Sequence, residues 1–365
     1  MHSFIFTESG LTLTACGVAQ EFDRISDANE YLHDGLSLIV GALPFHRTDA
    51  PRLFAPREYK FSSEPVMLES PDALPAVASV DFLPPLSVHQ QRIEQCIAEI
   101  QAGTLDKLVL SRAERFHFTG PVNPEAVLAG YMASAGTGFG YLVELVDGGF
   151  FIGPSPEVLI KKQGREISSF PLAGTAMRSA DPELDRAIAA NLQASEKDLH
   201  EHSFVTAGIR EALAPLCTQL EIPEIPLVMH TAHTWHLGTP IRGILRSDVD
   251  MSALDLAQLL HPTAAVCGTP RQAAGRIIEE LEGLSRTFYA GPVGWVDWHG
   301  EGQWCIAIRG AQIPPIPVHS IGVTGVGPVT VYGGSGIMPD SDPDDELAET
   351  RAKMRTVMDA LESAS

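Results

Sequence analysis

Two stretches of the chain place strand-forming residues on both sides of a turn that is too short to hold a helix. In "YLVELVDGGFFIGPSPEVLI", apolar runs flank Asp147-Gly148-Gly149, and an Asp-Gly pair between such runs is a hairpin signal. A second pair of runs, "AGPVGWVDWHGEGQWCIAIRGAQI", turns within residues 299–302. Parallel strands need a crossover of a dozen or more residues, so both pairs must be antiparallel. The sequence therefore predicts an α+β protein rather than a doubly wound parallel sheet.

Helical patterns separate the strand-like segments. The stretch "SVHQQRIEQCIAEIQAG" places Ile93, Ile97 and Ile100 on one face, and Gly103 is a typical C-terminal stop. Residues 1–85 instead contain Pro-interrupted segments such as "DAPRLFAPREYKF", which break regular structure and predict strands laid over a larger body. Further helices are predicted at 183–215, 251–260, 270–284 and 342–362.

Composition and charge restrict the possible functions. The chain has 365 residues, of which 44% are hydrophobic and 19% charged, as in a packed enzyme. Its formal net charge of −21 argues against nucleic-acid binding and against docking on anionic lipid. An anionic substrate would therefore need a local cluster of cations or a bound metal.

Cysteine usage and the start of the chain indicate a cellular compartment. Five scattered cysteines without CxxC spacing predict a reducing environment and no structural zinc site. The start, "MHSFIFTESG", lacks the basic segment and apolar core of a secretory signal. No uninterrupted apolar run approaches about 18 residues, the length that a membrane span needs. We therefore expect a cytoplasmic protein without membrane contact.

Two predicted helices carry carboxylates at helical spacing. Asp198 and Glu201 lie three residues apart in "SEKDLHEH", and Glu346 and Glu349 do so in "SDPDDELAETRAK", where Lys353 follows on the same face. The simplest interpretation of each is a solvated acidic face. If the two helices face each other, however, the same residues would form the oxygen-rich kind of site that Mg²⁺ prefers.

Three other residues are candidates for chemistry. Lys107 lies among apolar neighbours in "DKLVLSR" and either reaches solvent or lines a cavity, where it can act as a base. Glu157, in "GPSPEVLI", is either a turn carboxylate or a partly buried general acid. Arg309 ends "CIAIR" and is a candidate carboxylate clamp. The glycine-rich stretches "PLAGTAMR" and "VYGGSGIM" are either simple turns or loops whose N–H groups approach an anion.

The order of these motifs carries more information than any one of them. "DKLVLSR", "FIGPSPEVLI", "PLAGTAMR", "SEKDLHEH", "TWHLGTP", "HPTAAVCGTPR", "YAGPVGW", "CIAIRGA", "GGSGI" and "SDPDDELAETRAK" together resemble the chorismate-utilising enzymes, and most closely their isochorismate synthase branch. The resemblance covers roughly residues 88–362. It implies a two-lobed antiparallel β-sandwich with flanking helices. We expect a single chorismate-binding domain over 1–365, with N-terminal lobe strands at 1–86 and the core at 87–365.

The resemblance also assigns roles to residues. It implies an isomerase that uses Mg²⁺ to convert chorismate to isochorismate, with water attacking C2 of the ring and the C4 hydroxyl leaving. Lys107 would activate the water and Glu157 would protonate the leaving hydroxyl. Glu201 and Glu349 would bind Mg²⁺, with Glu346 supporting them directly or through water. The residues implied in substrate binding are Gly174, Thr175, His236, Ala265, Arg309, Gly334 and Lys353.

Three positions discriminate within the family. Anthranilate synthases tend to carry glutamine in place of Lys107, because their nucleophile is ammonia, so no amidotransferase partner is expected here. Aminodeoxychorismate synthases tend to carry lysine in place of Ala173. Salicylate synthases tend to carry threonine in place of Ala265 and go on to lose pyruvate. All three positions favour release of isochorismate, and the motif style favours siderophore over menaquinone synthesis.

Three alternative functions stay open, and the sequence departs from the family pattern in two places. A salicylate synthase, a menaquinone-pathway isochorismate synthase and a non-catalytic chorismate-binding relative are the alternatives. The sequence reads "GGSGI" where the family commonly has "GAGI", so Ser335 adds a hydroxyl near the substrate loop. The link at 312–332 also looks longer than usual.

Overall fold

Antiparallel strands dominate the protein, as its tight turns predict. The computed structural model describes residues 2–8, 10–33, 37–64, 66, 68, 74–134, 139–315 and 327–362. In these ranges, one sheet of 17 strands and one of three account for the β structure, and all recorded pairings are antiparallel. The central part of the 312–332 link lies outside the described residues. Among the described helices, none is long and apolar enough to cross a membrane.

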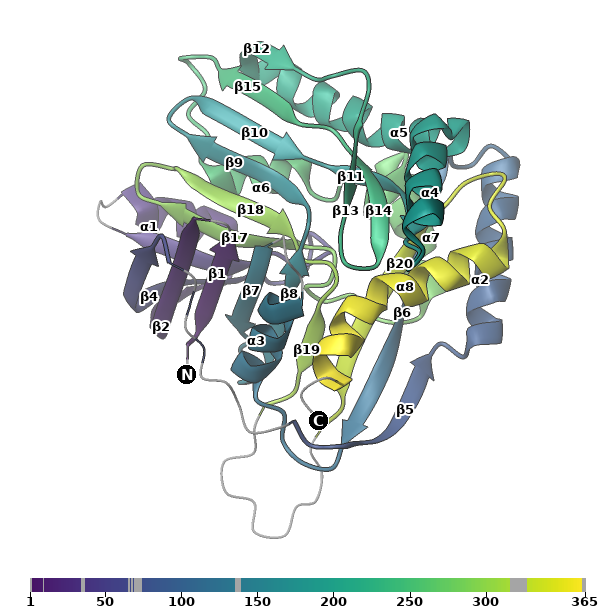
Figure 1. The fold of residues 1–365 in the computed structure, drawn as a ribbon. Coiled ribbons are helices and arrows are strands. Elements are labelled where there is room, and N and C mark those ends of the chain that lie inside the picture. The colour runs from purple at the N-terminus through teal and green to yellow at the C-terminus, as the bar shows by residue number, and fades with distance from the viewer. Residues whose placement is uncertain are drawn as a thin grey trace.

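One half of the large sheet is built mainly from the middle of the chain (Figure 1). Following the strand pairings from the outer edge inward gives an order that ends at the N-terminal strands. The strands in that order are β12 (Cys217–Glu221), β15 (Ile241–Leu245), β10 (Glu166–Phe170), β9 (Val158–Gln163), β18 (Gly302–Ile306), β17 (Pro292–Asp297), β3 (Leu38–Ala42) and β4 (Arg52–Ser62).

The other half continues the same sheet from β4 and carries the strands that bear the site. Its order is β2 (Leu11–Phe22), β1 (Phe4–Glu8), β7 (Phe139–Glu144), β8 (Phe150–Ser155), β19 (Ala311–Ile313), β20 (Val329–Ile337), β6 (Lys107–Phe118) and β5 (Val77–Leu83), with β16 (Gly268–Thr269) also on β6. The N-terminal strands β1 to β4 thus join the two halves, which explains how residues far apart in sequence meet in one core.

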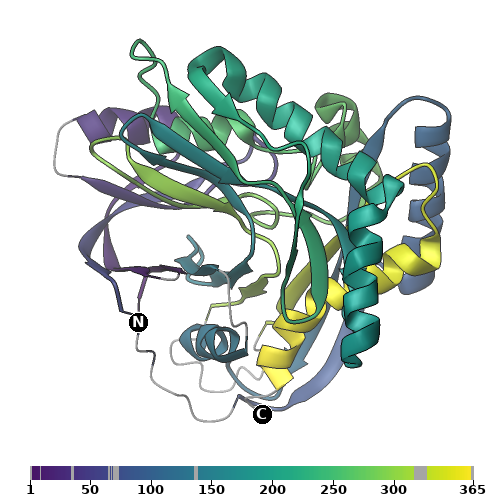
Figure 2. The same cartoon turned by 45° about the horizontal axis from the view of Figure 1, so that its top comes forward.

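A small sheet and eight helices complete the fold (Figures 1 and 2). The small sheet has the order β11 (Leu172–Met177), β14 (Thr234–Gly238) and β13 (Leu227–His230). Among the described residues the helices are α1 (Ile25–His33), α2 (Leu86–Gln101), α3 (Pro124–Ser134), α4 (Pro182–Ala194), α5 (Glu196–Leu213), α6 (Ala253–Leu260), α7 (Arg271–Glu282) and α8 (Pro343–Glu362), with a 3₁₀ turn at Ala214–Leu216.

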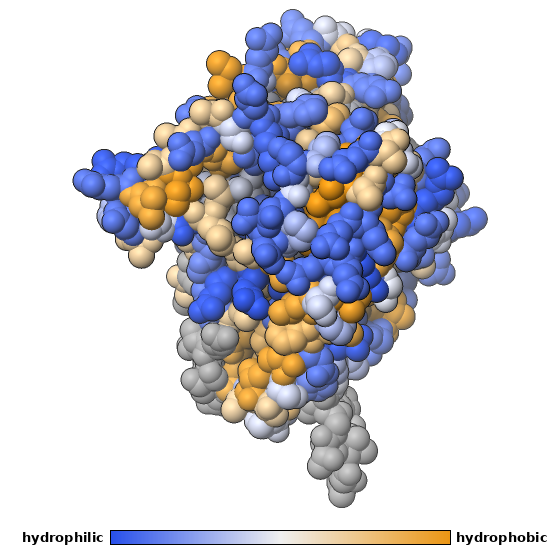
Figure 3. Space-filling view, turned by 90° about the vertical axis from the view of Figure 1, so that its right-hand side faces the viewer, coloured by the Kyte–Doolittle hydropathy of each residue, from blue (hydrophilic) through white to orange (hydrophobic). Residues whose placement is uncertain are grey.

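Packing places the helices around the sheets. Helices α4 and α5 contact the small sheet, and α8 lies along β20. Helix α2 packs on α8 and β6, whereas α6 covers β9, β17 and β18. Figure 3 shows that the face at the right of Figure 1 is mostly hydrophilic, with hydrophobic patches between the charged side chains. The buried face of each of these helices therefore packs against the sheets or against another helix.

The predicted helix at 183–215 is in fact two helices. Ser195 has an extended backbone (φ −70°, ψ 112°), and its hydroxyl accepts a hydrogen bond from the N–H of Asp198. A serine side chain that takes up a first-turn N–H is a typical N-cap. The prediction of one continuous helix was wrong because the sequence pattern has no proline or glycine at this break. The ends predicted for the other helices agree with the structure to within two residues.

Candidate active site

A cavity lies where β6 and β20 meet β11, β14 and the turn that follows β8. Helices α5 and α8 reach it from the side of the small sheet, in the region where α8 crosses β20 in Figure 1. Most of the predicted site residues line it, namely Glu157, Gly174, Thr175, Glu201, His236, Ala265, Arg309, Gly334 and Lys353. The remaining three, Lys107, Glu346 and Glu349, lie behind this lining and interact with residues in it.

Lys107 points inward from the first position of β6. Its side chain is fully buried, and Nζ lies 2.9 Å from Oε1 of Glu201 on α5. The approach is that of an ion pair without hydrogen-bond alignment, so Nζ has no hydrogen-bond partner among the described residues. Lys107 therefore does not reach solvent, and its side chain lies behind the cavity lining.

Glu157 is a buried carboxylic acid at the end of the hairpin formed by β7 and β8. Only 2% of its surface is exposed. Burial raises the pKa of Glu157 to about 8, and a hydrogen bond from the backbone of Leu172 and the charge of Lys107 offset this only in part. At neutral pH the side chain is therefore mostly protonated and can donate a proton.

Arg309 and His236 form a hydrogen-bonded pair in the wall. Nη2 of Arg309 lies 2.9 Å from Nε2 of His236, and because a guanidinium only donates, Nε2 must be the acceptor. Nδ1 of His236, 3.2 Å from the hydroxyl of Thr175, then carries the proton. Burial and the nearby cations Arg309 and Lys353 hold the pKa of His236 well below its usual range, so the ring is neutral.

The second guanidinium nitrogen of Arg309 is available to a ligand. Nη1 is buried and has no hydrogen-bond partner within the described ranges. Burial lowers the pKa of Arg309 to about 10, which still leaves it charged. The backbone of Arg309 is left-handed (φ 57°), as is that of Ala290 (φ 64°) in the same wall. Non-glycine residues in this conformation are strained and gather at functional sites.

Helix α8 brings a cation and two carboxylates to the site. Nζ of Lys353 lies 2.6 Å from Oε1 of Glu349 and donates to the carbonyl of Gly334 over 3.1 Å. Glu346, one turn earlier, accepts a 2.6 Å hydrogen bond from Ser341 and lies 3.4 Å from Lys197. Helices α5 and α8 therefore meet at Lys197 and Glu346, and Glu346 is buried rather than part of a solvated face.

The three carboxylates repel one another. Burial and the charge of Glu349 raise the pKa of Glu346 to about 7. Burial also raises the pKa of Glu349, which Lys353 opposes and Glu201 reinforces. Burial has the same tendency at Glu201, but there the ammonium of Lys107 prevails and the pKa is lowered. A divalent cation among them would relieve this repulsion.

The donor chemistry of these carboxylates fits Mg²⁺. All three supply oxygen, and Oε2 of Glu346 is buried without a hydrogen-bond partner among the described residues. In the described part of the chain, no three His, Cys, Asp or Glu side chains are gathered tightly enough to hold a metal ion. Lys107 and Lys353 instead each contact one of the carboxylates, Glu201 and Glu349.

A glycine is required at Gly174 on β11. Its backbone is left-handed (φ 80°), and an added Cβ would lie 3.1 Å from Cβ of Asp198 on α5. At Gly334 on β20, an added Cβ would lie 2.7 Å from Oγ of Ser111. Both glycines therefore let backbone groups border the cavity closely. Ser335, which follows Gly334 in β20, is buried but does not line the cavity.

Sequence reasoning missed several residues of the wall. Ser111 lies on the same face of β6 as Lys107, and strand alternation over four residues was a signal that could have revealed it. Tyr289 also lines the cavity and stacks on Tyr332 with ring centroids 5.0 Å apart. No periodic signal marks Tyr289, because it lies in the irregular segment between α7 and β17.

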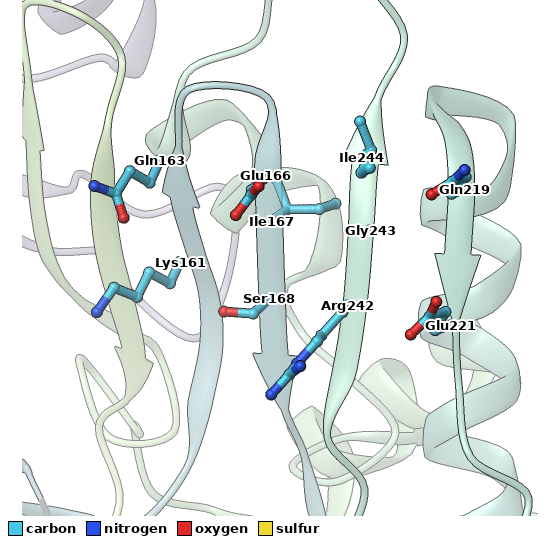
Figure 4. A pocket seen from close by; sticks show the side chains of 10 residues that line it. All are labelled: Lys161, Gln163, Glu166, Ile167, Ser168, Gln219, Glu221, Arg242, Gly243 and Ile244. Atoms are coloured by element: carbon cyan, nitrogen blue, oxygen red, sulfur yellow. The ribbon is translucent and has the colours of Figure 1, made fainter.

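A larger hollow lies elsewhere and lacks this chemistry. It spans β9, β10, β15 and β12, and Figure 4 shows its polar side chains standing on the open face of these strands. Glu166, Glu221 and Arg242 are exposed there. None of the predicted site residues lies in it, and its charged groups remain in contact with solvent. The smaller cavity is therefore the candidate active site.

Comparison with known proteins supports this choice. The family model described as "Chorismate binding enzyme" matches residues 69–362. The MenF protein of Mycobacterium tuberculosis is 39% identical over 363 residues, which cover 96% of this chain and 93% of that protein. Isochorismate synthase EntC of Escherichia coli is 35% identical over 329 residues, covering 89% of this chain and 81% of EntC.

Solved structures agree with the fold and the family. DhbC of Bacillus anthracis, a 2,3-dihydroxybenzoate-specific protein by its description, superposes with a TM-score of 0.89 at 33% identity, over 99% of this chain and 96% of that one. The menaquinone-specific isochorismate synthase MenF of Escherichia coli has the same fold, with a TM-score of 0.86 at 23% identity over 99% and 89% of the two chains. The chain therefore belongs to the chorismate-binding enzyme family, within its isochorismate synthase branch.

Proposed function

We propose that this protein, as an isochorismate synthase, isomerises chorismate to isochorismate in the cavity lined by Glu157, with Lys107 behind its wall. The observation that carries the proposal is the burial of the Glu157 carboxyl in this wall, which raises its pKa to about 8. A reaction that exchanges one ring hydroxyl for another needs an acid for the leaving group and a base for the incoming water. Glu157 supplies the acid, and the buried amine of Lys107 lies behind the cavity lining.

Lys107 supports the second half of this exchange. Its side chain lies against the cavity wall, since an added Cβ at Gly336, which lines the cavity, would lie 3.2 Å from Cε of Lys107. We assign Lys107 to activation of the water that attacks C2, and Glu157 to protonation of the hydroxyl that leaves C4. One water is added and one is lost, so the product has the same mass as the substrate.

Cations around the cavity support binding of a dicarboxylate. Arg309 presents Nη1 toward a ligand, and Lys353 lies beside Gly334. We assign substrate carboxylate binding to these two side chains and to the backbone of Gly174 and Gly334, with Thr175, His236 and Ala265 shaping the wall.

We assign Mg²⁺ to Glu201 and Glu349, with Glu346 in support. When bound, Mg²⁺ would neutralise a substrate carboxylate that these three acidic groups would otherwise repel. Ala265 offers no hydroxyl at the position associated with pyruvate loss, which favours release of isochorismate over formation of salicylate.

For the pathway, we propose a catechol siderophore route. The motif style of the sequence supports this route, as does the superposition on DhbC of Bacillus anthracis, whose description specifies 2,3-dihydroxybenzoate. The menaquinone pathway is the alternative, since MenF of Mycobacterium tuberculosis is 39% identical. Restoration of siderophore production in a strain lacking its isochorismate synthase would support this route. Restoration of menaquinone synthesis alone would contradict it.

Two variants test the assigned roles. Lys107→Ala and Glu157→Gln should each lower kcat by about 10²-fold or more, because each removes one of the two proton transfers. Lys162, a lysine of β9 away from the cavity, provides the matched control as Lys162→Ala and should retain full activity. Near-normal turnover by either active-site variant, with thermal unfolding unchanged, would refute the role of that residue.

A further inference from the structure

A second hollow of ligand size lies behind the active-site loop. It is bounded by α5, by the end of α6 and by the segment 262–271, and its volume is about 690 Å³. Small-molecule sites typically have volumes of about 300–1,000 Å³. Its lining is largely apolar, and Phe204, Leu259 and Pro262 are partly exposed there. The hollow can therefore accept a small molecule with an apolar body.

The lining of this hollow carries a net positive charge, although the chain as a whole is acidic. Arg47 and Arg271 both line it, and Glu211 is the one carboxylate in the described lining. Two guanidinium groups against one carboxylate leave a net positive charge, although the whole chain carries −21. Both side chains are exposed, and each uses one guanidinium nitrogen to donate to a backbone carbonyl, Arg47 to Gln258 and Arg271 to His261. The remaining N–H groups of each guanidinium are left for an anion.

The start of helix α7 adds to the positive charge at this hollow. Helix α7 begins at Arg271 without a side-chain cap, which adds the positive end of its dipole.

The same segment also borders the active site. Thr263 and Ala264 face the second hollow, whereas the next two residues, Ala265 and Val266, line the catalytic cavity. A molecule in the second hollow would therefore contact one side of a loop whose other side shapes the substrate site.

We propose that the hollow formed by α5, α6 and residues 262–271 binds a small aromatic carboxylate. Its carboxylate pairs with Arg47 and Arg271, and its ring packs on the partly exposed side chains of Phe204 and Leu259. Because the ligand supports the loop from behind, occupancy presses Ala265 and Val266 toward the catalytic cavity and raises the KM for chorismate. This last step rests on the proposed function, whereas binding itself does not.

Benzoate and benzamide are the matched probes, because they share a ring and differ in charge. Titration calorimetry on the purified chain should give binding of benzoate and at least tenfold weaker binding of benzamide. Arg47→Ala and Arg271→Ala should each weaken benzoate binding about tenfold. Arg210→Ala, on α5 but outside the hollow, should leave the affinity unchanged. Inorganic phosphate should bind more weakly than benzoate, since it lacks the apolar body.

Gly208 allows the hollow to be filled. An added Cβ there meets no atom within 4 Å, so Gly208→Phe should fold normally and abolish benzoate binding while chorismate turnover is retained. In the unmodified protein benzoate should raise the KM for chorismate, and in Gly208→Phe it should not. Benzoate that still binds Gly208→Phe and competes with chorismate would place it in the catalytic cavity and overturn the proposal. Absence of binding would overturn it as well, and chorismate turnover in the same samples tests the proposed function separately.

Discussion

The chemistry of the site depends on what burial does to single ionisable groups. Glu157 and His236 are both buried, and in both burial favours the neutral form, which makes the first an acid and the second a neutral hydrogen-bonding ring. Glu201 is buried as well, yet it remains a carboxylate because Lys107 lies 2.9 Å away. The contrast between Glu157 and Glu201 is the kind of separation in pKa that distinguishes an acid from a ligand.

The raised pKa of Glu157 predicts a pH-dependent stability. Its ordinary pKa is 4.5 and the folded value is about 8, so folding is linked to proton uptake. The stability contribution is complete below about pH 4.5 and is lost as the pH rises through 8. Between pH 6 and 8 the protein should lose about 2 kcal/mol relative to Glu157→Gln, since each pKa unit corresponds to about 1.4 kcal/mol. Urea unfolding of both proteins checks this, and parallel pH curves would contradict it.

Substitution of Arg309 should affect substrate binding more than turnover. In Arg309→Lys one amine replaces the planar guanidinium, so the contact to His236 and the available Nη1 cannot both be kept. We expect the KM for chorismate to rise about tenfold or more, with a smaller change in kcat. Arg355→Lys, at an exposed arginine of α8, is the control. An unchanged KM in Arg309→Lys would remove Arg309 from substrate binding.

At the scale of elements, the site depends on where α5 begins and on how α8 is attached to β20. The cap at Ser195 fixes the start of α5, which carries Glu201. Lys353 ties α8 to β20 through the carbonyl of Gly334. The cluster of carboxylates is thus assembled by local hydrogen bonds at the ends and sides of helices.

Ser195→Ala should therefore destabilise the protein by about 1 kcal/mol, the usual effect of losing an N-cap. Ser203→Ala, at an exposed serine inside the same helix, should change the free energy of unfolding by less than about 0.5 kcal/mol. Denaturant unfolding measures both. Equal stabilities of the two variants would show that Ser195 does not determine where α5 begins.

How much the sequence could predict differs from element to element. The hairpin at 147–149 and the helices at 86–101 and 343–362 follow from local signals, turn glycines and helical periodicity, and they are confirmed. The break at Ser195 could not be predicted, because a serine is common both inside helices and at their caps. The inward orientation of Lys107 could not be predicted either, since it depends on Glu201 of α5, which comes from a distant part of the sequence and pairs with it.

The same limit applies to the site. Motif order brought together the residues that line the cavity, because it carries family information that spacing lacks. The wall residues Ser111 and Tyr289 also lie in the quoted motifs "DKLVLSR" and "YAGPVGW", but only tertiary packing shows that their side chains line the cavity.

At the scale of the whole molecule, one continuous sheet joins the lobes and surrounds the cations with an acidic surface. The chain carries −21, whereas chorismate is a dianion. Long-range repulsion should slow the encounter at low salt and be screened at physiological ionic strength, where the Debye length is about 8 Å. At constant Mg²⁺, kcat/KM should therefore rise as NaCl is increased from about 10 to 150 mM. A steep fall instead would mean that the local cations dominate the approach.

The central claim is that the cavity exchanges one hydroxyl of chorismate for another and stops there. The most direct measurement is a ¹H NMR time course of chorismate with the purified chain and Mg²⁺, repeated with EDTA. We predict the signals of isochorismate, approach to an equilibrium mixture, no accumulation of pyruvate, and loss of conversion with EDTA. Pyruvate as the main product, or unchanged chorismate in the presence of Mg²⁺, would contradict this account.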